Sequence, residues 1–143
     1  MPNWCLNRVV FASEDEDTLD FIRGAFDSDA PFQTLCPEPE WVNTPNKDGV
    51  YPGPRYKGEF AHYFPDGSID ERWYAWRLSN WGTKWDIGTE SHCLQDSTGC
   101  LEYEFDTAWC PPDELKFYLE EQYPDLEITW FYHEPGCCLA GYI

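Results

Sequence analysis

Basic residues are scarce in this chain. Nine Lys and Arg stand against 27 Asp and Glu, which gives a formal net charge of -18. Nucleic acid and anionic lipid are bound by basic faces, so direct contact with either is not expected. A charge of this size costs stability through self-repulsion. It indicates either a very soluble surface or a surface that meets a basic partner.

Long apolar runs are also absent, and no leader segment is expected. No stretch approaches the roughly 20 apolar residues that span a bilayer, and the N-terminal residues 1–4 lack the features of a secretory signal. We therefore expect a cytoplasmic protein of a bacterial host, without membrane contact. The seven cysteines are an odd number without regular spacing. In a reducing cytoplasm they are expected to be free thiols, most of them buried.

Motifs of known catalytic or metal chemistry are missing. The three histidines, His62, His92 and His133, fall in no HExxH or related pattern. Zinc ligands usually come in pairs such as CxxC, and the chain has no such pair. We therefore expect no metal and no other cofactor, and a binding protein rather than an enzyme. A small hydrolase, metal-dependent or acid–base, that uses His92, His133 and nearby carboxylates is kept as an alternative.

The hydrophobic pattern predicts one α+β domain over residues 1–143. Alternation predicts strands over 4–12, 90–95, 100–106, 126–132 and 137–143, and helical stripes predict long helices that begin after Ser13 and after Pro111. Capping boxes place Ser13 and Ser68 as helix caps. This order predicts a ferredoxin-like sandwich, mainly antiparallel, with two long helices on one face. A Pro- and Gly-rich insert over about 30–67 is expected to leave the core.

A tryptophan-rich stretch over residues 72–86 organises the rest of the prediction. We expect a helix from Ile69, a stop at Gly82 and a strand over 84–87. The favoured interpretation is that these aromatics pack the helix onto the sheet. The alternative is a pocket for a small ligand or peptide, lined by Trp76, Arg77, Trp81, Lys84, Trp85, Asp86 and Trp109.

Carboxylates gather in rows and clusters. Glu102, Glu104 and Asp106 alternate on one strand face, so they lie about 6.6–6.8 Å apart, roughly twice the 3.4 Å rise per phosphate of one DNA strand. On one surface, such rows would imitate a phosphate backbone. The predicted partner-binding residues are Glu14, Asp15, Glu16, Asp17, Asp20, Glu102, Glu104, Asp106, Asp113, Glu114, Glu120 and Glu121.

Six segments carry a likeness to a known family. They are MPNWCxN (1–7), WYxWR (73–77), NWGTKWD (80–86), FDTAWxPP (105–112), YPDL (123–126) and YxEPG (132–136). In this order they resemble the YubB-type proteins with a ferredoxin-like domain that are found on plasmids and phages. The resemblance implies the fold, a mobile-element origin and a small cytoplasmic protein, but no iron–sulfur cluster and no agreed activity. Cys110, where a serine is expected, and the Pro-rich insert depart from the family pattern.

Charge and resemblance together give a functional hypothesis. The protein is expected to be a phage- or plasmid-encoded binding protein that inhibits a host defence complex, such as a CRISPR effector or a restriction enzyme. It would occupy the basic nucleic-acid channel of that complex as a DNA mimic. Its partner would thus be a basic nucleic-acid-binding protein and not nucleic acid itself.

Overall fold

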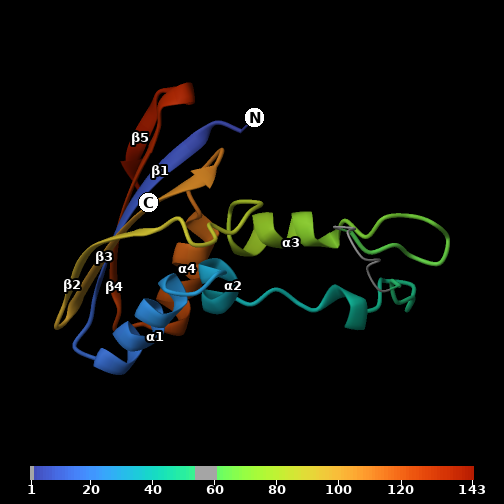
Figure 1. The fold of residues 1–143 in the computed structure, drawn as a ribbon, viewed down its shortest axis with the longest axis horizontal. Helices are drawn as coiled ribbons and strands as arrows, with labels where there is room; N and C mark the ends of the chain where they lie inside the picture. The colour runs from blue at the N-terminus through green and yellow to red at the C-terminus, as the bar shows by residue number, and fades with distance from the viewer. Residues whose placement is uncertain (1, 54–60) are drawn as a thin grey trace.

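A computed structural model describes residues 2–53 and 61–143. It shows a five-stranded sheet with helices against it and a long projection to one side (Figure 1). The strands are β1 Trp4–Ala12, β2 His92–Ser97, β3 Cys100–Ala108, β4 Glu127–Glu134 and β5 Leu139–Tyr142. The helices are α1 Glu16–Phe26, α2 Pro31–Leu35, α3 Arg72–Asn80 and α4 Asp113–Gln122, with 3-10 turns η1 Trp41–Asn43 and η2 Pro135–Cys137.

The sheet has the order β2-β3-β1-β4-β5, and every neighbouring pair is antiparallel. β1 lies at the centre, as its apolar residues on both faces predict. The four strands β1 to β4 with α1 and α4 form the ferredoxin-like arrangement, and β5 extends the sheet beyond β4. The predicted α+β sandwich is therefore confirmed.

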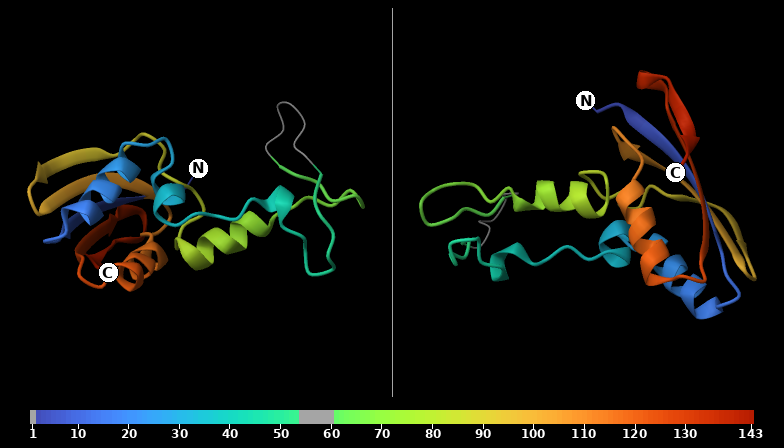
Figure 2. Two further views of the ribbon diagram at one scale, coloured as in Figure 1. Left: turned by 90° about the horizontal axis from the view of Figure 1, so that it is seen from below. Right: turned by 180° about the vertical axis from the view of Figure 1, so that it is seen from behind.

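One face of the sheet is covered and the other is open. α1 and α4 lie on the same side (Figure 2), and the core between helices and sheet is aromatic. Phe26 of α1 stacks on Tyr103 of β3 with ring centroids 4.1 Å apart, and Phe105 meets Trp130 edge to face. Each buried aromatic ring contributes a large apolar area, so these contacts hold α1 and the central strands together.

Residues 37–53 and 61–80 project from the body as an arm, in which α3 runs along one side (Figures 1 and 2). The Pro-rich insert was expected over about 30–67, but α2 packs into the core through Phe32 and Cys36 is buried there too, so the projection begins only after Cys36. Part of the insert, residues 54–60, lies outside the described residues. At the other end, Trp81 is again buried in the body.

Two local predictions in the tryptophan-rich stretch are wrong. The helix begins at Arg72 instead of Ile69, because Ile69 pairs with Tyr63 in an isolated bridge and Asp70 accepts a hydrogen bond from the Arg72 N–H. Residues 84–87 form a loop, not a strand. Asp86 there accepts hydrogen bonds from the N–H groups of Phe32 and Gln33 at the start of α2.

Smaller shifts occur at the strand and helix ends. β2 spans His92–Ser97 instead of 90–95, and β5 begins only at Leu139 because the residues before it form the turn η2. Asp15, not Ser13, caps α1, since its carboxylate accepts from the Asp17 N–H. Ser13 instead accepts from the N–H of Asp15.

The cysteines are less buried than expected. All seven are free, but only Cys5 and Cys36 are buried, so the prediction that most are buried is wrong. Burial raises the pKa of the Cys5 thiol to about 11, which makes this thiol unreactive at neutral pH. None of the helices within the described residues is long and apolar enough to cross a membrane.

Candidate functional site

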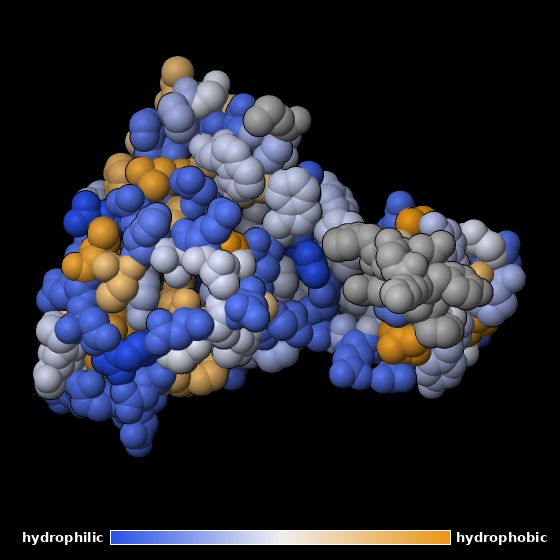
Figure 3. All heavy atoms as spheres, in the orientation of Figure 1, coloured by the Kyte–Doolittle hydropathy of each residue, from blue (hydrophilic) through white to orange (hydrophobic). Residues whose placement is uncertain are grey.

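The negative charge is concentrated on the body of the molecule. The sequence segment 36–80, which contains the arm, has seven acidic and five basic residues, a net of -2; the remaining 20 acidic and four basic residues give the body -16. Hydrophilic side chains cover much of the visible face of the body, and the arm stands apart from it (Figure 3). A partner attracted by charge would therefore meet the body first.

The open face of the sheet carries the predicted row of carboxylates. Glu102, Glu104 and Asp106 alternate with the buried residues of β3, so all three lie on the side away from α1 and α4. Arg8 of β1 pairs with Glu102 at 2.7 Å. This ion pair neutralises one end of the row. Arg8 also feels the charge of Glu104, its cross-strand neighbour, but neither Glu104 nor Asp106 forms an ion pair within the described residues.

Asp106 lies in a negative local field. Burial raises the pKa of its carboxyl, and the charges of Glu104 and Glu90 raise it further, while His92 lowers it. These neighbours disfavour the ionised form of Asp106. A cation bound here would offset the same repulsion, so the electrostatic field at this part of the face favours positive charge.

A second acidic region lies at the end of the sheet where α1 begins. There the α4–β4 connection meets the start of α1 around an open hollow of about 810 Å³. Its lining residues are Ala12, Ser13, Glu14, Asp15, Gly99, Pro124, Asp125 and Glu127. We call this hollow the acidic end. Its four carboxylates come from both segments, which the sequence could not place together.

Half of the twelve predicted partner-binding carboxylates have roles inside the fold. Asp15, Glu16, Asp20, Glu102, Asp113 and Glu120 accept hydrogen bonds or form ion pairs within the chain. Glu16, for example, accepts from the N–H of Gly99 in the β2–β3 turn. The other six have no such side-chain contact within residues 2–53 and 61–143: Glu14, Asp17, Glu104, Asp106, Glu114 and Glu121.

The seven residues of the alternative pocket divide among three places. Trp76, Arg77 and Trp81 form the junction between arm and body. Arg77 binds Glu38 at 3.0 Å and lies over the rings of Trp73 and Trp81, while the Trp81 indole N–H donates to the Cys36 carbonyl. These contacts close the junction, so the aromatics are packing residues as expected. The expectation that they pack the helix onto the sheet is wrong, because α3 lies in the arm and has no buried residue.

The side chains of the other pocket residues lie elsewhere, although the Lys84 carbonyl accepts a hydrogen bond from Arg77 at 3.1 Å. Asp86 caps α2, as described above, whereas Lys84, Trp85 and Trp109 lie at the end of the sheet where β1 begins. The Trp85 ring is 6.5 Å from that of Trp4, and the Lys84 Nζ lies 4.3 Å from the Trp85 ring centroid. Exposed aromatic rings therefore gather beside the open face. Trp4 is one of them, although the sequence pattern did not indicate Trp4 as a pocket residue.

Trp109 is held outward by an unusual turn. The Cys110 N–H donates to the Ala108 carbonyl at 2.9 Å, which closes a three-residue γ-turn with Trp109 at φ +72°. Such a turn is rare and strained, above all with a large central residue. Thr83 Oγ1 donates to the same Ala108 carbonyl, and the Trp109 N–H donates to the carbonyl of Asn3.

Segments that carry the family resemblance meet at this end of the sheet. Asn7 is fully buried, donates to Thr107 Oγ1 at 2.8 Å, and accepts from the Trp130 indole N–H at 3.1 Å. Thr107 Oγ1 in turn donates to the carbonyl of Cys110. Asn7 thus ties β1, β3 and β4 together, a role that the sequence gives no means of assigning.

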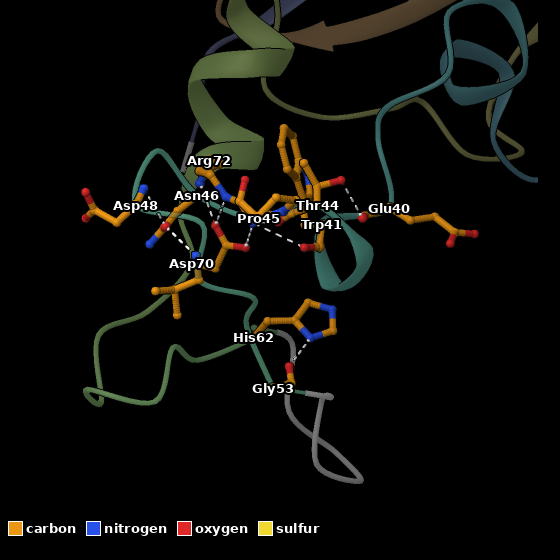
Figure 4. Close-up of polar contacts among 11 residues, drawn as sticks. Glu40, Trp41, Thr44, Pro45, Asn46, Asp48, Gly53, His62, Asp70 and Arg72 are labelled. Atoms are coloured by element: carbon orange, nitrogen blue, oxygen red, sulfur yellow. Dashed lines mark hydrogen bonds and ion pairs between the residues drawn. The ribbon is translucent and has the colours of Figure 1, made fainter.

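The arm has its own polar centre around Arg72 (Figure 4). The Arg72 guanidinium binds both oxygens of buried Asp70 at 2.9 Å and donates to the carbonyls of Trp41, Thr44 and Pro45. Burial alone would raise the pKa of Asp70, but the hydrogen bonds from Arg72 outweigh it and lower that pKa. We call this cluster the arm latch, because it joins the start of α3 to residues 41–45.

An apolar hollow of about 450 Å³ lies on the arm beside α3. It is lined by Ala61, Ile69, Glu71, Trp73, Tyr74 and Ala75. Its volume is within the range of small-molecule and peptide sites. None of the seven predicted pocket residues lines it.

The remaining candidates for chemistry lie far apart. His92 on β2 and His133 on β4 are separated by β3 and β1, hence by three strand spacings, or about 14 Å. The two histidines cannot share one metal ion at that separation. Among the residues that the structure describes, no group of three or more His, Cys, Asp or Glu is arranged to hold a metal.

Comparison with known proteins supports the ferredoxin-like fold and leaves the YubB-type assignment and the phage or plasmid origin untested. Residues 80–143 match the family model described as the ferredoxin-like domain in Api92-like protein. The crystal structure of the protein api92 from Yersinia pseudotuberculosis is similar over 99% of this chain and 93% of that chain, with a TM-score of 0.59 and 14% identity. At that identity the likeness concerns the fold alone. A comparison with curated proteins finds no match.

Proposed function

We propose that the protein binds a basic nucleic-acid-binding protein and keeps nucleic acid out of its channel. The observation that carries this proposal is the concentration of charge on the body, with carboxylates that have no partner inside the described fold. Following the family resemblance, we place its origin on a phage or plasmid. Its target is then a host defence complex such as a CRISPR effector or a restriction enzyme.

The physical basis is electrostatic. Glu104 and Asp106 repeat along β3 at about 6.6–6.8 Å, and the acidic end adds four more carboxylates. A surface of one sign raises the association rate with a partner of the opposite sign, and salt weakens this attraction. Binding should therefore be fast and salt-sensitive, and nucleic acid should compete with it.

The direct test passes host lysate over the immobilised protein at low salt. Bound proteins are eluted with salt in one experiment and with DNA at low salt in a parallel one. A nuclease or CRISPR complex that is retained and then displaced by DNA supports the proposal. The critical variant is the pair Glu104→Lys and Asp106→Lys, which should abolish retention. Its charge-matched control is Asp29→Lys and Asp48→Lys, at exposed positions outside the open face and the acidic end.

Two results would contradict the proposal. Equal losses in both double variants would mean that net charge alone, and not a defined surface, is responsible for the binding. Retention that DNA does not displace would mean that the partner is bound outside its nucleic-acid channel.

A second candidate function is the binding of a small ligand or peptide in the hollow of the arm. Its size and its lining by Ile69, Trp73 and Tyr74 favour this role. A ligand there should change the tryptophan fluorescence, and Trp73→Phe should alter that change. A screen in which no compound or peptide shifts the fluorescence would count against this function.

A further inference from the structure

Three tryptophans are exposed together at the end of the open face. Trp4 and Trp109 are each 49% exposed, and Trp85 is 37% exposed. Trp4 and Trp85 are in ring contact, and Trp109 directly follows Ala108, the β3 partner of Trp4. We call Trp4, Trp85 and Trp109 the tryptophan end.

This arrangement lowers the stability of the fold. Burial of a large apolar ring stabilises a folded protein, yet Trp109 is held outward by a γ-turn at φ +72°. Hydrogen bonds from Thr83 and to Asn3 fix the backbone on both sides of that residue. Strain that the surrounding structure maintains is often found at binding sites, so the outward position of Trp109 is a reason to look for a ligand.

The kind of ligand follows from the neighbours. The ammonium of Lys84 already lies 4.3 Å from the centroid of the Trp85 ring, so a cation is accommodated on an aromatic face here. On the adjacent strand, Asp106 is opposite Leu6, two residues along β1 from Trp4. Exposed indole faces beside carboxylates are complementary to a flat cation.

We propose that the tryptophan end receives arginine side chains of the basic partner, with guanidinium groups stacked on Trp4 and Trp109. Asp106 supplies the nearest negative charge, and Glu104 follows two residues further along β3. The guanidinium is planar and stacks on aromatic rings. It is also more weakly hydrated than an ammonium, so its desolvation costs less free energy. This inference rests on the proposed function, and adds that the protein selects arginine over lysine.

Two peptides of equal charge provide the test: deca-arginine and deca-lysine, titrated calorimetrically at low salt. The wild-type protein should bind deca-arginine about tenfold more tightly, from roughly threefold for each of two rings. The double variant Trp4→Ala and Trp109→Gly should bind both peptides with the affinity that wild type has for deca-lysine. Glycine is chosen for residue 109 because it adopts positive φ without strain.

The control is Tyr51→Ala, which removes an exposed ring of the arm and should leave the arginine preference unchanged. Near-UV circular dichroism confirms that each variant is folded. Equal binding of the two peptides by wild type, or a preference that survives in the double variant, would overturn the inference while the proposed function stands. If neither peptide binds, the inference and the proposed function both fail.

Discussion

At the scale of single residues, Asn7 shows how one buried amide fixes three strands. It contacts Thr107 on β3 and Trp130 on β4, and donates to the Cys5 carbonyl of its own strand at 3.0 Å. Asn7→Ala would leave the Trp130 indole N–H buried without a partner. We expect a loss of about 2–4 kcal/mol in the free energy of unfolding, because an unsatisfied buried group costs its full desolvation.

Urea unfolding measures this loss. Asn43→Ala is a suitable control, since Asn43 is exposed on the arm and its side chain binds only Glu40 among the residues that the structure describes. Its effect should stay within about 0.5 kcal/mol. A similar small effect at Asn7 would show that the polar network is dispensable.

Asp106 gives a prediction with a defined pH dependence. Its pKa in the folded protein is raised by burial, Glu104 and Glu90, so ionisation of Asp106 costs stability, and this cost appears as the pH rises through that pKa. Asp106→Asn should therefore raise the melting temperature at pH 7. At pH 3, where the aspartate is protonated in wild type, the two proteins should melt alike. A variant that is equally stabilised at both pH values would exclude the electrostatic explanation.

The sequence predicts which carboxylates share a face, but not which of them are already occupied. Alternation along β3 correctly gives the row of Glu102, Glu104 and Asp106. That Arg8 neutralises Glu102 depends on the register of β1 against β3, and that Glu16 binds Gly99 depends on a contact across 83 positions. Contacts of this kind exist only after the chain has folded.

At the scale of elements, prediction succeeds where local pattern and tertiary contacts agree. β1 and β3 follow from alternation, and α1 and α4 from their apolar stripes. The pattern fails at residues 84–87, where apolar alternation suggests a strand but Asp86 is drawn to the N-terminus of α2, more than 50 positions earlier. It also misplaces the start of α3, because Ser68 binds Asp66 and does not cap the helix.

The arm latch predicts that arm and body differ in stability. Arg72→Ala would leave Asp70, whose side chain is 2% exposed, as a buried charge without its partner. Breaking such a pair costs about 3–5 kcal/mol. We expect this loss of stability in the arm alone, because the hydrogen bonds of the Arg72 side chain are all with residues of the arm. Hydrogen exchange should accelerate in the amides of residues 41–46 and 70–75, while β1 and β3 stay protected.

The control for the latch is Arg8→Ala. Arg8 forms an exposed ion pair with Glu102 on the body, and such pairs contribute little. Exchange in the arm should be unchanged in this variant. If Arg72→Ala accelerates exchange equally in arm and body, the two parts unfold together and the latch is not a local element.

At the scale of the whole molecule, the negative charge has two opposite effects: it lowers the stability of the fold and it strengthens the proposed binding. The body holds a net charge of -16 and the sequence segment 36–80 has -2, so repulsion acts mainly within the sheet and its two covering helices. Salt screens exposed charges over about 8 Å at physiological ionic strength. Added salt should therefore stabilise the protein under the same conditions in which it weakens the proposed partner complex.

Neutralising the six carboxylates without internal contacts separates these two effects. We expect the variant with Gln or Asn at Glu14, Asp17, Glu104, Asp106, Glu114 and Glu121 to melt at a higher temperature than wild type, with a weaker dependence on salt. A matched variant at the six carboxylates that do have contacts, Asp15, Glu16, Asp20, Glu102, Asp113 and Glu120, has the same net charge. It should melt lower, because it loses three ion pairs and the charge in its internal hydrogen bonds. Melting curves at 10 mM and 500 mM salt distinguish the two. If the stabilised variant still retains the partner, the acidic surface serves solubility, and the tryptophan end or the arm has to account for binding.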